Sequence, residues 1–206
     1  MKNILRNLLP LAILLPVIIA CNAAKEIEKG IKEIAEPKII GSDDGSCQVT
    51  VPALWSEEKG LHEDASLGAH NALSDAYIMV IKDVKSDFKK GFTVDDYAKL
   101  LRDDLPSRME ENEMSPVTTT QINGFEAREF ETSGLAEGLK IKYLYALVST
   151  PDAFYQVISW TTPSRFDKNR TEMTEALHSF KLVSSGSSPS NNLDRKKAGG
   201  GLDKKN

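Results

Sequence analysis

The sequence is poor in the residues that build disulfide scaffolds and membrane spans. It has two cysteines and three histidines in 206 residues, and aromatic side chains make up 7% of it. Two cysteines cannot support a small disulfide-rich fold. The longest apolar run, residues 8–20, is shorter than the ~20 residues that a helix needs to cross a bilayer. We therefore exclude a disulfide scaffold and a polytopic membrane protein, and we expect one globular domain with flanking segments.

The chain also lacks short motifs that mark common catalytic and nucleotide sites. It has no Gly-x-Ser-x-Gly and no His-Glu-x-x-His pattern. Its run of three glycines, residues 199–201, lies in a polar C-terminal segment, so it does not predict a phosphate-binding loop. We expect a protein that is not an enzyme and needs no cofactor.

The N-terminus has the pattern of an export signal. Lys2 and Arg6 precede the apolar run, which ends Ile-Ile-Ala20-Cys21. This ending resembles the lipobox of bacterial lipoproteins, which implies cleavage between Ala20 and Cys21 and acylation of the Cys21 thiol. Two or more acyl chains give stable membrane anchoring. The alternative is an ordinary signal peptide followed by an incidental cysteine.

The residue after the lipobox cysteine bears on the membrane. Lipoproteins with Asp at this position are usually retained in the inner membrane of a two-membrane envelope. This chain has Asn22, which favours the outer membrane, facing the periplasm, if the host has two membranes.

Charge is distributed unevenly along the chain. Residues 46–183 carry 15 Lys or Arg and 22 Asp or Glu, a net charge of −7, whereas residues 184–206 carry 5 and 2, a net charge of +3. An acidic body argues against a nucleic-acid partner. The basic segment is interpreted as a disordered tail, with contact to anionic lipid or cell-wall polymer as the alternative.

The composition divides the chain into four segments. Residues 1–20 are the signal peptide, residues 21–45 the lipidated cysteine and a tether, residues 46–183 the folded domain, and residues 184–206 the basic tail. The tether includes a Lys/Glu-rich stretch that Pro37 ends, followed by a turn-rich boundary at residues 41–46.

Within the domain, the pattern alternates strands with two helices. A helix is expected after Thr93, where Asp96 completes a capping box, and Pro106 should kink or split it. A second helix opens near Pro163. The Asn123-Gly124 pair is a strong hairpin signal. Strands are expected at residues 47–52, 76–84, 117–122, 125–132, 139–149 and 154–160.

Hairpin connections this short cannot carry parallel crossovers, so the sheet should be largely antiparallel and the fold class α+β. The run at residues 76–84 is almost continuously apolar at its start, which suits a central strand covered on both faces.

Potential metal ligands are sparse. His62, Glu63 and Asp64 lie eight residues before His70, a spacing that matches neither a helical pair nor a zinc finger. We interpret them as polar loop residues, and His178 as a histidine on a helix surface. The acidic pairs do not form a calcium loop: Asp43-Asp44, Asp95-Asp96 and Asp103-Asp104. No metal site is predicted.

Three glutamates on one predicted strand are the best catalytic candidates. Glu126 with Glu129 or Glu131 could form a glycosidase dyad. Glu129 and Glu131 share a strand face, however, and lie near Arg128 and the strand that carries Lys140 and Lys142. Cross-strand ion pairing is therefore the preferred interpretation.

Cys47 is the second cysteine of the chain. It precedes a strand, and no CxxC pattern, His or Lys next to it argues for a lowered thiol pKa. We expect an inert, partly buried thiol.

Aromatic residues concentrate on the last two predicted strands. They are Tyr143, Tyr145, Phe154, Tyr155 and Trp160. If both faces of the sheet are covered, most belong to the core. If one face is open, they would instead form a groove for a peptide, a glycan or an acyl chain.

Several segments resemble the PsbP-like domain family. The stretch VTVPALW at residues 49–55 is similar to its first strand and Trp turn, NGFEAR at 123–128 to its hairpin, and FYQVISW at 154–160 to its penultimate strand. The final helix ending Ser179-Phe180 also matches. The resemblance covers residues 46–183. It implies an antiparallel sheet of six or seven strands between helical layers, and a protein that acts by binding other macromolecules.

These observations favour a non-catalytic lipoprotein that contacts the bilayer through acylated Cys21 and binds or stabilises an envelope protein complex. The alternative is a carrier or sensor of a small hydrophobic ligand, which predicts an aromatic-lined pocket between sheet and helix.

Overall fold

The computed structural model describes residues 36–183. The signal peptide, Ala20, Cys21, most of the tether and the basic tail lie outside the described residues. The elements follow in chain order: β1 (Lys38–Gly41), β2 (Cys47–Val51), β3 (Ser56–Glu57), β4 (Ala65–Asn71), β5 (Ala76–Val84), the 3-10 turn η1 (Lys85–Asp87), α2 (Val94–Arg108), β6 (Glu110–Met114), β7 (Thr118–Ile122), β8 (Phe125–Ala136), β9 (Leu139–Ser149), β10 (Ala153–Thr161), α3 (Pro163–His178) and β11 (Lys181–Leu182).

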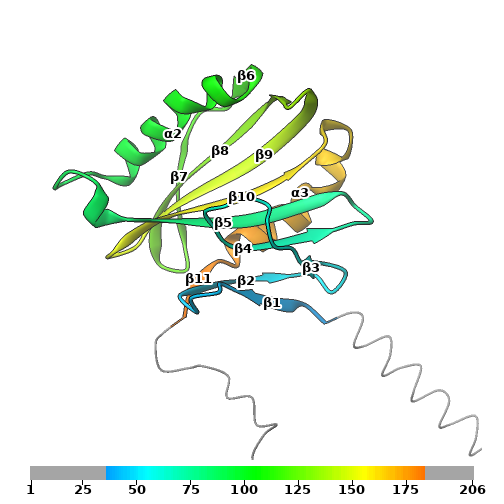
Figure 1. Cartoon of the computed structure of the whole chain (residues 1–206), viewed down its shortest axis with the longest axis horizontal. Coiled ribbons are helices and arrows are strands. Elements are labelled where there is room, and N and C mark those ends of the chain that lie inside the picture. The colour runs from blue at the N-terminus through cyan, green and yellow to red at the C-terminus, as the bar shows by residue number, and fades with distance from the viewer. Residues whose placement is uncertain (1–35, 184–206) are drawn as a thin grey trace, which may run out of the picture.

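An eight-stranded antiparallel sheet forms the centre of the domain. Its order is β3-β4-β5-β10-β9-β8-β6. Strand β7 pairs with the first half of β8, on the same edge of β8 that β6 pairs with farther along. Helix α2 lies over one face and α3 over the other, and the small antiparallel sheet β1-β2-β11 lies on the α3 side (Figure 1). The expected α+β class and the helix–sheet–helix layers are confirmed.

The sheet has more strands than expected, because several short strands have no strand pattern in their sequence. Strands β3 and β6 (SE and EENEM) are polar, and β4 (ASLGAHN) consists mainly of small residues. Strand β1 was also missed: it pairs with β2, so residues 38–41 belong to the fold and not to the tether. Strand β8 continues through residues 133–136, where a turn was expected.

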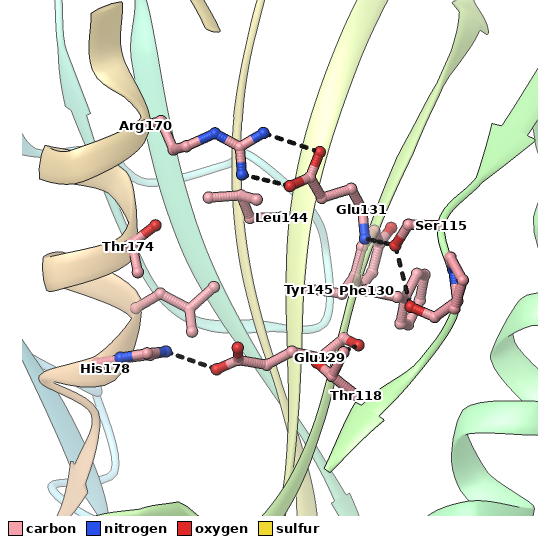
Figure 2. Close-up of a pocket in the computed structure, with 12 residues that line it drawn as sticks. Ser115, Thr118, Glu129, Phe130, Glu131, Leu144, Tyr145, Arg170, Thr174 and His178 are labelled. Atoms are coloured by element: carbon pink, nitrogen blue, oxygen red, sulfur yellow. Dashed lines mark hydrogen bonds and ion pairs between the residues drawn. The ribbon is translucent and has the colours of Figure 1, made fainter. Parts of the chain in front are cut away.

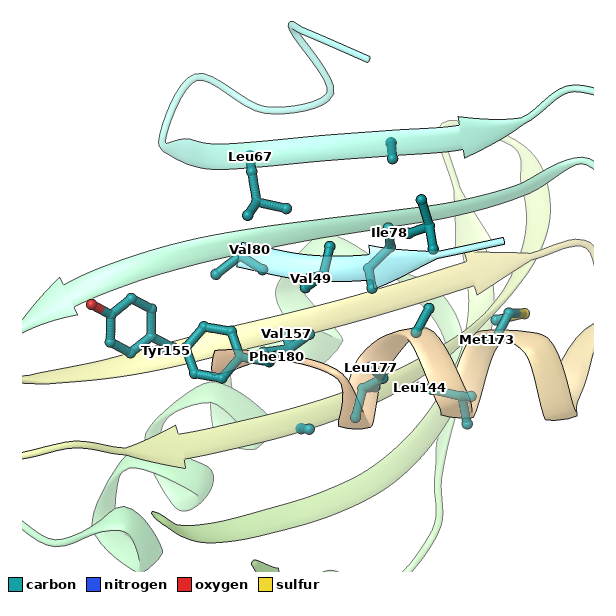
Figure 3. Packing of buried hydrophobic residues seen from close by; sticks show 14 of the residues in the cluster. Val49, Leu67, Ile78, Val80, Leu144, Tyr155, Val157, Met173, Leu177 and Phe180 are labelled. Carbon is teal, nitrogen blue, oxygen red and sulfur yellow. The ribbon is translucent and has the colours of Figure 1, made fainter. Parts of the chain in front are cut away.

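The core on the α3 side is closed. Buried side chains of the main sheet meet β2 and α3, and Phe180 packs against Tyr155 at a ring separation of 4.9 Å (Figure 3). Phe166, Met173 and Leu177 of α3 are buried, so one side of this helix packs on the sheet.

The core on the α2 side is only partly covered. The helix lies mainly on β8, β9 and β6, and it meets β10 through Tyr97, which stacks on Phe154. Farther along β5 and β10, Met79 and Trp160 stay in partial contact with solvent. Tyr77 and Met79 on β5 are half-buried, so this strand is not covered on both faces along its whole length as expected. The α2 side of the sheet is therefore partly open to solvent.

Helix α2 starts as its sequence predicts and continues past Pro106 to Arg108. The Thr93 hydroxyl accepts the Asp96 N–H at 3.1 Å, and the Asp96 carboxylate accepts the Thr93 N–H at 2.9 Å. Pro106 does not split the helix, because it lies in the last turn and its missing N–H removes a single hydrogen bond. Leu100 on this helix is 51% exposed.

Candidate functional site

A cleft lies between strand β8 and helix α3. It encloses about 240 Å³. Glu129 and Glu131 project into it from β8, because alternate residues of a strand share a face. Arg170, Thr174 and His178 face them from α3 at intervals of four residues, which puts them on one side of the helix (Figure 2).

Ion pairs connect the two walls of the cleft. Arg170 binds both carboxylate oxygens of Glu131, and Lys142 on β9 lies 3.1 Å from the same carboxylate. The His178 ring contacts the Glu129 carboxylate. Burial disfavours the ionised form of Glu131, but hydrogen bonds from Arg170 and Lys142 outweigh it and lower the pKa of this carboxyl. The cleft therefore holds an ionised Glu131 between two cations and a Glu129 carboxylate in contact with the His178 ring.

Ser115 bridges the gap between β6 and β7, which pair with the same edge of β8. Its hydroxyl accepts the Glu131 N–H at 2.9 Å, and its own N–H donates to the Glu131 carbonyl at 2.9 Å. Both backbone groups of Glu131 are thus satisfied where neither β6 nor β7 can reach them. Arg102 of α2 donates to the Ser115 carbonyl at 2.7 Å, which ties this link to the opposite helix.

The predicted ion pairing of the glutamates is confirmed in part. Glu131 pairs with Lys142 across the strands, as expected. Arg128 points to the other face of the sheet, where it binds Asp95 and Glu126, and Lys140 lies 3.6 Å from Glu111 instead. The strand alternation that joins Glu129 to Glu131 excludes Arg128 from their face.

Helix α3 supplies residues that the sequence analysis missed. Arg170 and Thr174 carry no motif, and only their spacing from His178 marks a shared helix face. The same helix provides Glu172, whose carboxylate accepts the Trp55 indole N–H. Their partners lie at least 39 residues away in the chain, so no local pattern could identify these contacts.

The other polar candidates stay apart. Among residues 36–183, no three His, Cys, Asp or Glu side chains gather as a metal-binding group. His62 is in a loop, whereas His70 is on strand β4, 3.1 Å from Glu58 and not in a loop as expected.

The acidic pairs have separate structural roles. Asp96 caps α2, and Asp95 binds Arg128. Asp43 lies beside Lys59, and Asp44 binds the Ser42 hydroxyl and Lys82. Asp103 and Asp104 form ion pairs one helical turn away, with Lys99 and Arg108.

Cys47 is fully buried as the first residue of β2. Burial raises the pKa of its thiol, which keeps the sulfur protonated and unreactive. The prediction of an inert thiol agrees with this environment.

The aromatic residues divide between the core and the partly open face. Phe154, Tyr155 and Tyr145 are buried, as the core interpretation predicted. Tyr143 and Trp160 pack against the core on the α2 side but stay half-buried. Helix α2 meets β10 at the other end of the strand, where Tyr97 stacks on Phe154 at a ring separation of 4.7 Å, and Trp160 lies six residues beyond that contact.

No helix in the described part of the chain combines the length and the apolar character needed to cross a membrane. No protein-family model matches the sequence, and no curated protein matches it. The comparison with solved structures, in contrast, finds the fold.

Cyanobacterial PsbP (CyanoP) from Synechocystis sp. PCC 6803 matches with a TM-score of 0.55 at 15% identity, over 73% of this chain and 94% of that one. LpqN, described as involved in cell envelope biogenesis of Mycobacterium tuberculosis, matches with a TM-score of 0.51 at 13% identity, over 72% and 91%. A protein from Bacteroides thetaiotaomicron VPI-5482 matches with a TM-score of 0.51 at 11% identity, over 73% of this chain and half of that one. The chain therefore has the PsbP-like fold that its sequence resembles.

Proposed function

We propose that this protein is a lipid-anchored envelope lipoprotein whose PsbP-like domain binds or stabilises an envelope protein complex without catalysing a reaction. Acylated Cys21 would hold it at the bilayer, in the outer membrane facing the periplasm if the host has two membranes. The structural likeness to LpqN, a protein of cell envelope biogenesis, supports an envelope setting.

The observation that supports a binding role is that both carboxylates in the β8–α3 cleft are engaged by neighbouring side chains. Glu131 is held ionised by two cations, and Glu129 is engaged by His178. A general acid needs a raised carboxyl pKa, and a nucleophile needs an adjacent free base. Carboxylates that are already engaged by neighbouring side chains instead suit recognition, because a charged or polar side chain of a partner can take the place of one of these neighbours.

Site-specific crosslinking in the native envelope tests this proposal. A photoreactive amino acid replaces Thr118 or Thr174 at the cleft in the full-length, lipidated protein, and replaces exposed Lys168 outside the cleft as the control. We expect one dominant protein adduct from the cleft positions and none from position 168. Reproducible adducts with lipid or glycan alone would overturn the proposal in favour of a ligand carrier.

The anchor is tested independently of the cleft. Cys21→Ser should abolish incorporation of labelled palmitate and move the protein out of the membrane fraction. Unchanged labelling would contradict acylation at Cys21.

A further inference from the structure

A row of aromatic rings crosses four strands on the partly open, α2 side of the sheet. His70 on β4, Tyr77 on β5, Trp160 on β10 and Tyr143 on β9 are direct cross-strand partners in register. Successive ring centroids lie 6.0, 5.2 and 6.0 Å apart. All four side chains are half-buried. We call this set the aromatic strip.

Three carboxylates border the aromatic strip. Glu58 lies 3.1 Å from His70, Asp75 accepts a hydrogen bond from the Tyr77 hydroxyl at 3.2 Å, and Glu137 is close enough to raise the pKa of Tyr143 further, after the larger effect of burial. Within residues 36–183, no Lys or Arg lies within 4.0 Å of any of the three. This pattern contrasts with the β8–α3 cleft, where Arg170 and Lys142 both bind Glu131.

Aromatic rings bordered by carboxylates favour a peptide rich in Lys and Arg. Lys and Arg lay their methylene groups on apolar surface while the charged end reaches an acceptor. On this surface the methylene groups of Lys or Arg would pack on the ring edges, and their charged ends would pair with the three carboxylates. A neutral acyl chain would leave the carboxylates unused, and an anionic ligand would be repelled by them.

This chain contains a segment with the required chemistry. Residues 193–197 read LDRKK, residues 202–205 read LDKK, and residues 184–206 have a net charge of +3 beside a domain with a net charge of −7. The chain leaves the fold at Val183, whose N–H bonds Ser46 next to β2, and the small sheet contacts β4, the strand that carries His70. The residues between Val183 and Arg195 can span roughly 40 Å, about the width of a globular domain of this size.

We propose that the aromatic strip is a binding surface for a basic peptide segment, and that residues 193–205 of this same chain occupy it. The association is electrostatic and exposed, so it weakens as salt rises. Attachment to the domain supplies a high effective concentration that compensates for a weak intrinsic affinity. The proposal needs neither the lipid anchor nor an envelope partner, so it can fail while the proposed function stands.

The two tryptophans allow a direct test. Trp160 belongs to the strip, whereas Trp55 is buried in the other core and serves as an internal control. The indole N–H signals and the acrylamide quenching of both are measured in the full-length chain and in a chain ending at Val183. We expect at least a twofold rise in Trp160 quenching on truncation, with no change at Trp55. A synthetic peptide of residues 184–206, added to the truncated chain, should reverse the rise at low salt and fail to do so at 1 M NaCl.

Charge variants separate a specific site from general attraction. Glu58→Gln with Glu137→Gln in the full-length chain should raise Trp160 quenching to the level of the truncated chain. Glu110→Gln with Glu113→Gln, on strand β6, removes the same charge elsewhere and should leave the quenching unchanged. Equal effects of both pairs, no effect of truncation, or peptide that binds phosphatidylglycerol vesicles without shifting the Trp160 signal would each overturn the proposal.

Discussion

Arg128 on strand β8 forms a two-point ion pair with Asp95 in the first turn of α2. Its Nε lies 2.6 Å from one carboxylate oxygen, and its Nη2 lies 2.8 Å from the other. The guanidinium side chain is only 8% exposed, and Glu126 provides a further contact at 2.8 Å. This pair fixes the start of α2 against the sheet. The hydrogen bond to Asp95 is the main cause that raises the pKa of Arg128, so the side chain is always charged.

Removing the partner of this buried cation should destabilise the fold. Asp95→Asn leaves the guanidinium with less compensation, so the urea midpoint should fall while the slope of the transition stays constant. Asp103→Asn breaks an exposed i,i+4 pair with Lys99 on the same helix and should change the midpoint much less. Equal shifts for the two variants would show that the Arg128 contact does not stabilise the domain.

The two helix starts should respond differently to loss of a hydroxyl. Thr93 accepts a hydrogen bond from the Asp96 N–H, whereas the Thr162 side chain makes no capping hydrogen bond with α3. Thr93→Ala should therefore cost about 1 kcal/mol of unfolding free energy, a typical value for a lost N-cap. Thr162→Ala should cost clearly less, as measured by urea unfolding of both variants. A larger effect at Thr162 would contradict the assigned caps.

Gly134 on β8 has no room for a side chain. A Cβ atom there would lie 2.6 Å from the Met109 side chain and 2.7 Å from the Glu110 carbonyl oxygen, where α2 passes into β6. Gly134→Ala should lower the unfolding free energy by about 1–3 kcal/mol through overpacking. Gly41 is the matched control, because its Cβ would meet only the Cys47 carbonyl at 4.0 Å. An unchanged unfolding free energy for Gly134→Ala would indicate that Met109 and Glu110 can move away from β8 without loss of stability.

Glu131 should contribute a pH-dependent part of the stability. Its pKa is lowered from 4.5 in the folded state, so its contribution is complete above the unfolded value and is lost as the pH falls through the lower folded value. The difference in unfolding free energy between the wild type and Glu131→Gln should therefore be largest near pH 7 and shrink below about pH 4.5. Urea unfolding at a series of pH values measures it.

Glu111→Gln provides the comparison for Glu131, because Glu111 is exposed and lies 3.6 Å from Lys140. Its effect should be small at every pH. A difference for Glu131→Gln that does not vary between pH 7 and pH 3 would contradict the assigned ionisation.

Local patterns in the sequence determined the main elements of the domain. The capping box at Thr93, the Asn123-Gly124 turn and Pro163 at the start of α3 depend on contacts within a few residues, and they formed as predicted. The alternation that places Glu129 and Glu131 on one face is equally local. The α+β class followed, because short hairpin turns permit only antiparallel neighbours.

Only the tertiary structure determined which strands pair and which faces of the sheet are buried. The polar strands β3 and β6 exist because their neighbours supply the pairing, and β1 joins the fold through β2. Arg170 reached Glu131 through the packing of α3 on the sheet. Trp160 and Tyr143 remained half-exposed because α2 meets β10 at the Phe154 end, through Tyr97, and Trp160 lies six residues farther along the strand. A strand sequence specifies which side chains share a face, whereas the packing of distant segments determines whether that face is buried.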